Sequence, residues 1–155
     1  MYKILHAISL ANVLQKKYPA FNFVPLFYMG SEDADLEELG HINIHQEKLN
    51  WHTAQKGAVG RMKIDNHFIS LTQRIEGEFG TYTFGKELVL LIKKCYTKNK
   101  TIQQATLEFV HTLFGKYGLV VLIADDKRLK QQMTAIFTDE ILNQTSQQIV
   151  AKTSA

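Results

Sequence analysis

Cysteine, proline and long apolar runs are scarce in this chain of 155 residues, which has one cysteine and two prolines. A single cysteine cannot form an internal disulfide, which excludes a disulfide-stabilised scaffold and suits a reducing compartment. The longest apolar run, GLVVLIA, is far too short to span a bilayer, and the first residues lack the apolar region and cleavage site of a signal peptide. We therefore expect a cytoplasmic protein with no membrane partner.

The chain also lacks a strong excess of charge of one sign, because its formal net charge is only +3. Its lysines and arginines are scattered, and no basic face with interleaved aromatic residues is visible, so we predict no nucleic-acid partner. Apolar residues, in contrast, make up 45% of the chain, which is enough for one domain with a core. Cys95 lies in an apolar helical pattern and is interpreted as a small buried residue.

Apolar periodicity predicts alternating helices and strands. Helices are expected at 3–18, 33–39, 85–96, 101–114 and 127–150. Ser31 or Asp33 is expected to cap the second helix, and Thr101 with Gln104 forms a capping box for the fourth. Strands covered on both faces are expected at 21–30 and 119–124, with shorter strands in HINIH, KLNWHT and NHFISL. The first helix has no capping residue before it, which suggests a chain that begins partway through a larger fold.

Acidic residues follow both of the longer predicted strands. They are Glu32, Asp33 and Asp35 after the first strand, and Asp125 and Asp126 after the second. Ligands of parallel α/β sheets bind beyond the carboxyl ends of the strands, so we expect these acids to border one crevice. They could recognise an amine or a metal-bound phosphate, or act as a general base. The alternative is that acids favour a first helical turn, which is the preferred interpretation for Glu37 and Glu38.

The stretch QKGAVGRM has two glycines between two cations, Lys56 and Arg61. Glycine lets backbone N–H groups approach an anion, and the cations would complement it. The alternative is a hairpin or bulge with two incidental cations. The stretch is not a Walker loop, because the terminal G-K-[ST] is missing.

Three histidines, His41, His45 and His52, lie near the first acidic stretch. His41 and His45 would lie on the same side of a strand, and with Asp33 or Asp35 they could bind a divalent metal. No metal-binding spacing supports this arrangement, so no metal site is predicted and the histidines are expected on solvated strand faces. Trp51 is expected to pack in the core or at its rim.

Four consecutive blocks carry a resemblance to a known family. They are YKILHAISLA, FVPLFYMGSEDADLEEL, QKGAVGRM and FGKYGLVVLIADDKRLK. In this order, over residues 2 to about 142, they resemble the cysteine-adding enzymes of bacillithiol synthesis, the BshC family. The resemblance implies a core similar to the Rossmann-like nucleotidyltransferase domain of class I aminoacyl-tRNA synthetases, with connecting-peptide insertions and a coiled coil that pairs subunits.

The expected fold is therefore α/β, a partial Rossmann-like core with an inserted connecting-peptide α+β segment. In this division, the core covers residues 1–40 and 101–142, the insertion covers 41–100, and 143–155 form a polar tail of the last helix. Family members are several times longer, and their glycine-rich block of the form Thr-Gly-Gln-Gln, expected just before YKILHAISLA, is missing here. The resemblance thus implies a central fragment.

The resemblance also implies a function, the addition of L-cysteine to glucosaminyl-malate in the last step of bacillithiol synthesis. By analogy with synthetases, ATP or another nucleotide would activate the cysteine carboxyl group for attack by the sugar amine. Glu32, Asp33 and Asp35 would be catalytic and would orient the amine or the nucleotide ribose. The expected substrate- or nucleotide-binding residues are Gly30, Ser31, Lys56, Gly57, Gly60, Arg61, Asp125 and Asp126. The expected partners are cysteine, the amino-sugar malate conjugate and a second copy of the chain.

This sequence departs from the family pattern at three positions in the first acidic block. Ala34 stands where the family typically has histidine, Tyr28 where tryptophan is common, and Leu36 where phenylalanine is common. The side chain of alanine cannot donate or accept a hydrogen bond or bind a metal ion. Two other functions therefore stay open. One is a non-catalytic binding or assembly module, and the weaker one is a metal-dependent hydrolase that uses Asp33, Asp35, His41 and His45.

Overall fold

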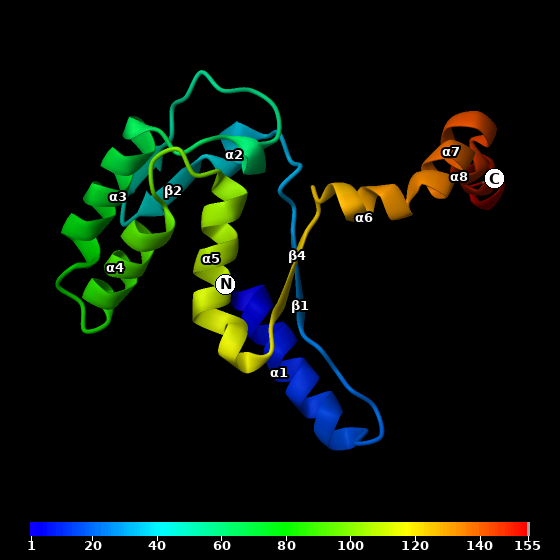
Figure 1. Ribbon diagram of the computed structural model, residues 1–155, viewed down its shortest axis with the longest axis horizontal. Coiled ribbons are helices and arrows are strands. Elements are labelled where there is room, and N and C mark those ends of the chain that lie inside the picture. The colour runs from blue at the N-terminus through cyan, green and yellow to red at the C-terminus, as the bar shows by residue number, and fades with distance from the viewer. Residues whose placement is uncertain (155) are drawn as a thin grey trace. The chain divides into compact units, whose positions relative to one another are not determined.

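The computed structural model describes residues 1–154 as helices and short strands in two compact units (Figure 1). The first unit, Met1–Ile123, contains α1 (Tyr2–Lys17), β1 (Leu26–Met29), α2 (Leu36–Leu39), β2 (His41–Ile44), β3 (Glu47–Asn50), the 3-10 turn η1 (Val59–Arg61), α3 (Asn66–Phe79), α4 (Gly85–Cys95), α5 (Ile102–Phe114), η2 (Gly115–Tyr117) and β4 (Val120–Ile123). The second unit begins at Ala124 and contains α6 (Lys127–Gln132), α7 (Thr134–Asn143) and α8 (Thr145–Thr153). The predicted four-part division of the chain stays a prediction.

The two predicted long strands pair in parallel, in a register that runs from Leu26↔Val120 to Met29↔Ile123. Their carboxyl ends therefore meet at the same edge of a small sheet, as an α/β fold requires (Figure 1). Helices α1 and α5 pack on this sheet through a core that contains Ile4, Ile8, Phe27, Val110, Phe114, Leu119 and Val121.

The prediction that both strands are covered on both faces is wrong. Leu26 and Tyr28 are 50% and 57% exposed, and Val120 is 46% exposed. These side chains alternate with Phe27 and Val121, which face the helices, so α1 and α5 cover one face of the sheet only.

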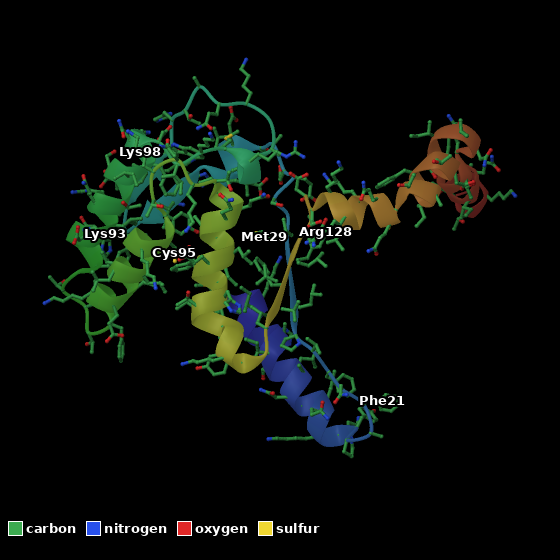
Figure 2. The ribbon with its side chains drawn as sticks, viewed as in Figure 1. Phe21, Met29, Lys93, Cys95, Lys98 and Arg128 are labelled. Carbon is green, nitrogen blue, oxygen red and sulfur yellow. The ribbon has the colours of Figure 1, made fainter. Side chains whose placement is uncertain are left out.

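The first strand is also shorter than predicted, because the residues before it bond to α1 instead of a neighbouring strand. The Gln15 side chain donates to the Phe21 carbonyl at 2.8 Å and accepts from the Phe23 N–H at 3.2 Å. Phe21 consequently lies on the loop between α1 and β1 with its ring exposed (Figure 2).

The stretch NHFISL, predicted to be a strand, is the start of helix α3. Asp65 caps this helix, with its carboxylate accepting from the Phe68 N–H at 2.8 Å. The same carboxylate accepts from the Trp51 indole N–H at 3.0 Å, and the Trp51 ring packs edge-to-face on Phe68. Trp51 is only 5% exposed, which confirms its predicted core position. The apolar residues of α3 recur every three or four positions, at 68, 71 and 75, a pattern that the short strand-like window concealed.

The stretch HINIH forms β2, which pairs with β3 in an antiparallel hairpin. His45 lies in the hairpin turn with a φ of 52°, so the prediction that it shares a strand face with His41 is wrong. The His45 ring lies 3.8 Å from the Glu78 carboxylate of α3. His41 approaches the Glu37 carbonyl at 2.9 Å. The two histidines thus have different partners.

The predicted helices α4 and α5 are confirmed, as is the capping box between them. The Thr101 hydroxyl accepts from the Gln104 N–H at 3.3 Å, and the Gln104 side chain accepts from the Thr101 N–H at 3.1 Å. Cys95, at the end of α4, is 0% exposed, as expected for a small buried residue (Figure 2). Burial raises the pKa of its thiol, which favours the protonated form.

The second unit differs from the prediction of one long helix at 127–150. Helices α7 and α8 are separated at Gln144, which adopts the left-handed conformation with a φ of 52° and ends α7. No residue from Lys127 to Thr153 is buried, and the apolar side chains of Ile136, Phe137, Ile141 and Leu142 are exposed. Over residues 1–154, no helix is both long and apolar enough to cross a bilayer.

Candidate functional site

The first acidic stretch and the glycine-containing loop, far apart in the sequence, are joined by main-chain hydrogen bonds. The Val59 N–H donates to the Asp33 carbonyl at 2.7 Å, and the Gly60 N–H donates to the Ser31 carbonyl at 3.1 Å. Because Gly30–Asp35 follows β1 directly, these bonds fix the loop beside the carboxyl end of a parallel strand. The structure thus brings together the segments that contain Glu32, Asp33, Lys56 and Arg61. The roles of these residues in a site stay predictions.

Two glycines of the loop have separate structural reasons to be there. A Cβ at position 60 would lie 2.4 Å from the Ser31 carbonyl oxygen and 2.6 Å from the Ser31 Cβ, so only glycine permits this approach. Gly57 has a φ of +93°, in the left-handed region that favours glycine. The interpretation as a simple hairpin is wrong, because residues 56–62 form a loop and the turn η1 rather than two paired strands.

The carboxylates of the acidic stretch are partly used for local structure. Asp33 accepts from the Asp35 N–H at 2.9 Å, and Asp35 accepts from the Glu38 N–H at 2.9 Å. Asp35 is therefore the cap of α2, in place of the predicted Ser31 or Asp33. For Asp35 the ordinary interpretation, an acid at a helix start, accounts for the position of the side chain.

Glu32 has a different partner, which no sequence motif indicates. The Tyr28 hydroxyl of β1 donates to the Glu32 carboxylate at 2.8 Å, and both residues are exposed. This hydrogen bond to an anion raises the pKa of Tyr28, because the phenol proton is held between the two groups. A tyrosine four residues before an acid, across the end of a strand, carries no recognisable motif, and only the turn at Gly30 brings the two together.

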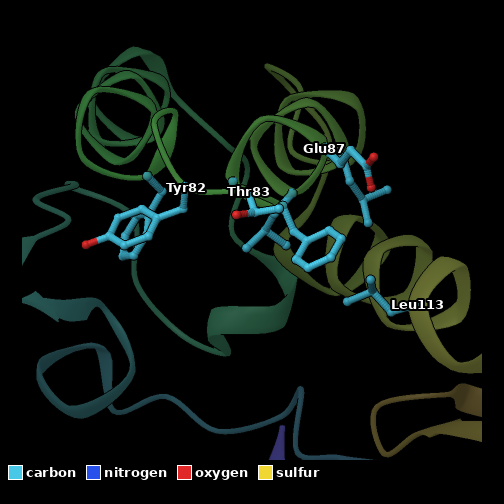
Figure 3. Close-up of a pocket in the computed structure, with 9 residues that line it drawn as sticks. Tyr82, Thr83, Glu87 and Leu113 are labelled. Atoms are coloured by element: carbon cyan, nitrogen blue, oxygen red, sulfur yellow. The ribbon is translucent and has the colours of Figure 1, made fainter.

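A hollow of about 340 Å³ lies beside the loop and is lined by Gln55, Lys56, Gly57, Ala58, Arg61 and Met62. Its two cations are side chains of the kind that match a phosphate or a carboxylate. A larger apolar hollow of about 630 Å³ lies elsewhere, between the α3–α4 turn and α5. Figure 3 shows Tyr82 and Thr83 on that turn, Glu87 on α4 and Leu113 on α5 around it. That hollow contains none of the predicted site residues.

Asp125 and Asp126, the predicted acids after the second strand, belong to the second unit, and each has a partner in α6. Asp126 caps α6 through the Arg128 N–H at 2.8 Å and also pairs with the Arg128 guanidinium at 3.1 Å. The Arg128 hydrogen bonds lower the pKa of Asp126. Asp125 pairs with the Lys130 ammonium. The prediction that these two acids share a crevice with Glu32 stays a prediction.

The metal-dependent hydrolase hypothesis gains no geometric support from the described part of the chain. Within residues 1–154, no three histidine, cysteine, aspartate or glutamate side chains are grouped so that they could hold a metal ion. His41 and His45 have the separate partners described above, and Asp35 is occupied as a helix cap. The donor set that this hypothesis needs is therefore dispersed.

Comparison with known proteins decides the family. Residues 1–155 match the family described as "Bacillithiol biosynthesis BshC, N-terminal Rossmann-like domain". The chain belongs to the BshC family. The Rossmann-like description agrees with the parallel pairing of β1 and β4.

Two BshC relatives illustrate the extent of the similarity. A protein named "Putative cysteine ligase BshC" from Flavobacterium psychrophilum is 37% identical over 157 residues, which cover 100% of this chain and 29% of the relative. Its namesake from Flavobacterium johnsoniae is 34% identical over 155 residues, which cover 99% of this chain and 29% of the relative. The chain thus spans less than a third of the length of these BshC relatives.

Proposed function

We propose that this chain is part of a ligase that adds L-cysteine to glucosaminyl-malate in bacillithiol biosynthesis. Membership of the BshC family, whose relatives carry the name of a cysteine ligase, supports the reaction class. The observation that carries the local assignment is the main-chain docking of the Lys56–Arg61 loop on Ser31 and Asp33. In this proposal the docked segments form one rim, with carboxylates on one segment and cations on the other.

In this proposal the two segments bind oppositely charged parts of the substrates. Glu32 and Asp33 face the amine that forms the amide bond, since carboxylates match ammonium groups and can accept a proton. Lys56 and Arg61 contact a phosphate or the malyl carboxylate. Gly57 and Gly60 let the loop backbone approach the ligand and the acidic segment. Asp35 supports the segment as the cap of α2.

ATP or another nucleotide is the proposed activating cofactor. The residues around the loop fit a phosphate in charge, because the hollow of about 340 Å³ is lined by two cations and by backbone of a glycine-containing turn. When bound, the nucleotide would supply activation of the cysteine carboxyl group. The role of this chain is then to orient the phosphate through Lys56 and Arg61. We also infer a cytoplasmic location, which the lone, buried Cys95 supports.

Calorimetric titration of the full chain with ATP, with and without Mg²⁺, tests this site. We expect saturable binding that Lys56→Ala weakens by at least about tenfold, since a charge-assisted hydrogen bond contributes on the order of 1.5–3 kcal/mol. Lys98→Ala is the matched control, because Lys98 is exposed in the turn between α4 and α5 and does not line the hollow beside the loop (Figure 2). A folded sample that does not bind ATP would refute a nucleotide site in this chain. Equal weakening by both variants would mean non-specific attraction.

A second candidate function, an assembly module, is favoured by the second unit. Helices α7 and α8 bury no residue, and Ile141 and Leu142 are more than 70% exposed. Exposed apolar stretches of this kind favour association with another surface, here a second copy of the chain. Sedimentation velocity of the full chain should reveal a dimer that Ile141→Glu dissociates, whereas Gln147→Glu on α8 leaves it intact. A wild-type monomer at high concentration would contradict this candidate.

A further inference from the structure

The Gln55 side chain closes the loop that contains Lys56 and Arg61. Its carboxamide oxygen accepts from the Lys63 N–H at 2.7 Å, and its nitrogen donates to the Lys63 carbonyl at 2.9 Å. The amide group thus pairs with the backbone of Lys63 as a neighbouring strand residue would. Residues 56–62 are held between these two points.

Gln55 is itself anchored to the folded core. Its side-chain nitrogen donates to the Thr53 hydroxyl at 3.1 Å. Thr53 hydrogen-bonds the Asp65 carboxylate, which also caps α3 and binds the Trp51 indole. The chain of contacts therefore runs from the buried Trp51 to the loop, and Gln55 is its last member.

Closure of the loop has a direct consequence for its cations. Gly57 has a φ of +93° and lies in an exposed part of the loop, so the loop backbone has little intrinsic stiffness. The loop is fixed by the Gln55 pair at its ends and by the Val59 and Gly60 N–H bonds in its middle. Without the two hydrogen bonds between Gln55 and Lys63, Lys56 lies on a flexible segment.

We propose that Gln55 is a positioning residue that sets the affinity of the Lys56–Arg61 loop for an anion. The inference rests on the proposed function, because it assumes that the loop binds a phosphate or carboxylate. Gln55 does not need to contact the ligand. It raises the fraction of molecules in which Lys56 and Arg61 are both in place, and apparent affinity is proportional to that fraction.

The test compares Gln55→Met with Gln73→Met in the full chain, using ATP as the probe. Methionine keeps the shape of glutamine but removes all three side-chain hydrogen bonds, two to Lys63 and one to Thr53. Gln73 is an exposed residue of α3. We expect Gln55→Met to weaken ATP binding on the order of tenfold by reducing the closed fraction, and Gln73→Met to leave it unchanged. Amide hydrogen exchange at Val59 and Gly60 should become faster in Gln55→Met only.

A double-mutant cycle with Lys56→Ala separates positioning from a general structural effect. If Gln55 acts through Lys56, Gln55→Met has little further effect on ATP affinity once Lys56 is alanine. Fully additive losses would overturn the proposal, as would wild-type affinity in Gln55→Met. If the folded wild-type chain does not bind ATP, the proposed site fails. Faster exchange at Val59 and Gly60 in Gln55→Met would then show that loop closure is real but serves no ATP site.

Discussion

Gly60 offers the sharpest test of the docked loop, because its backbone lies against Ser31. In Gly60→Ala the new methyl group would sit 2.4 Å from the Ser31 carbonyl oxygen, closer than real Cβ contacts. The loop must move away, and the hydrogen bonds from the Gly60 and Val59 N–H groups to Ser31 and Asp33 are lost together. Val59, which is 6% exposed in the wild-type structure, then loses part of its packing against Trp51 and Met62.

The expected loss of stability can be summed from these contacts. Each hydrogen bond contributes about 1 kcal/mol net. Partial exposure of Val59 adds roughly another 1 kcal/mol. The free energy of unfolding should therefore fall by about 2–3 kcal/mol. With a urea m-value of about 2 kcal/mol/M, the midpoint should fall by about 1–1.5 M.

Trp51 is the single tryptophan and is buried beside the loop, so its fluorescence reports unfolding of the first unit directly. Gly77→Ala is the matched control. A Cβ at Gly77, an exposed position of α3, would meet no atom of another element of residues 1–154 within 4 Å. The Gly77→Ala substitution should therefore stabilise α3 by about 0.5–1 kcal/mol. If Gly60→Ala has the same urea midpoint as the wild type, the loop is not docked on Ser31, and the proposed site lacks its structural basis.

Three further predictions concern the scaffold. Asp65→Ala removes the α3 cap and the Trp51 partner and should lower the free energy of unfolding by about 2 kcal/mol in urea unfolding. Burial raises the pKa of Asp65, but the hydrogen bonds from Phe68, Trp51 and Thr53 outweigh this effect and hold the pKa below its usual range. This contribution to stability is therefore present above the unfolded-state pKa of about 3.9 and is lost as pH falls through the pKa of Asp65 in the folded chain. The wild-type chain should thus lose stability in acid more steeply than Asp65→Asn. Parallel pH profiles of the two proteins would contradict this. Thr101→Ala should lower the thermal midpoint through a loss of about 1 kcal/mol from the capping box, and an unchanged midpoint would count against it. Cys95 should react with a thiol reagent only on unfolding, because the thiol is buried and its pKa is raised, and rapid labelling of the native chain would refute this burial.

Local signals in the sequence predicted much of the fold. The capping box at Thr101, the apolar stripe of α4 and the two strands that form the parallel pair all depend on neighbours within a few residues or on simple burial. The same reasoning missed α3, because a window of six residues cannot distinguish strand alternation from the start of a helix. It also missed the break at Gln144, since a glutamine in the left-handed conformation carries no local signal.

The candidate site was predictable in its parts but not in its assembly. Patterns of charge and glycine identified Glu32, Asp33, Lys56 and Arg61 as candidates. Their joining depends on main-chain bonds between residues more than 25 positions apart, which have no sequence signature. Gln55 lay inside the motif yet had no assigned role, because a side-chain amide that pairs with backbone at Lys63 becomes visible only in three dimensions.

The bonds that dock the loop run between main-chain atoms, which every residue possesses. The side chains at positions 32, 33, 56 and 61 can therefore be exchanged without removing these bonds, provided that position 60 stays glycine and position 59 stays apolar. Because main-chain bonds fix the loop while side chains supply the charges, this part of the surface is suitable for directed evolution. A library that varies positions 32 and 56 on a constant Gly60 should yield many folded proteins, and selection could then act on ligand preference.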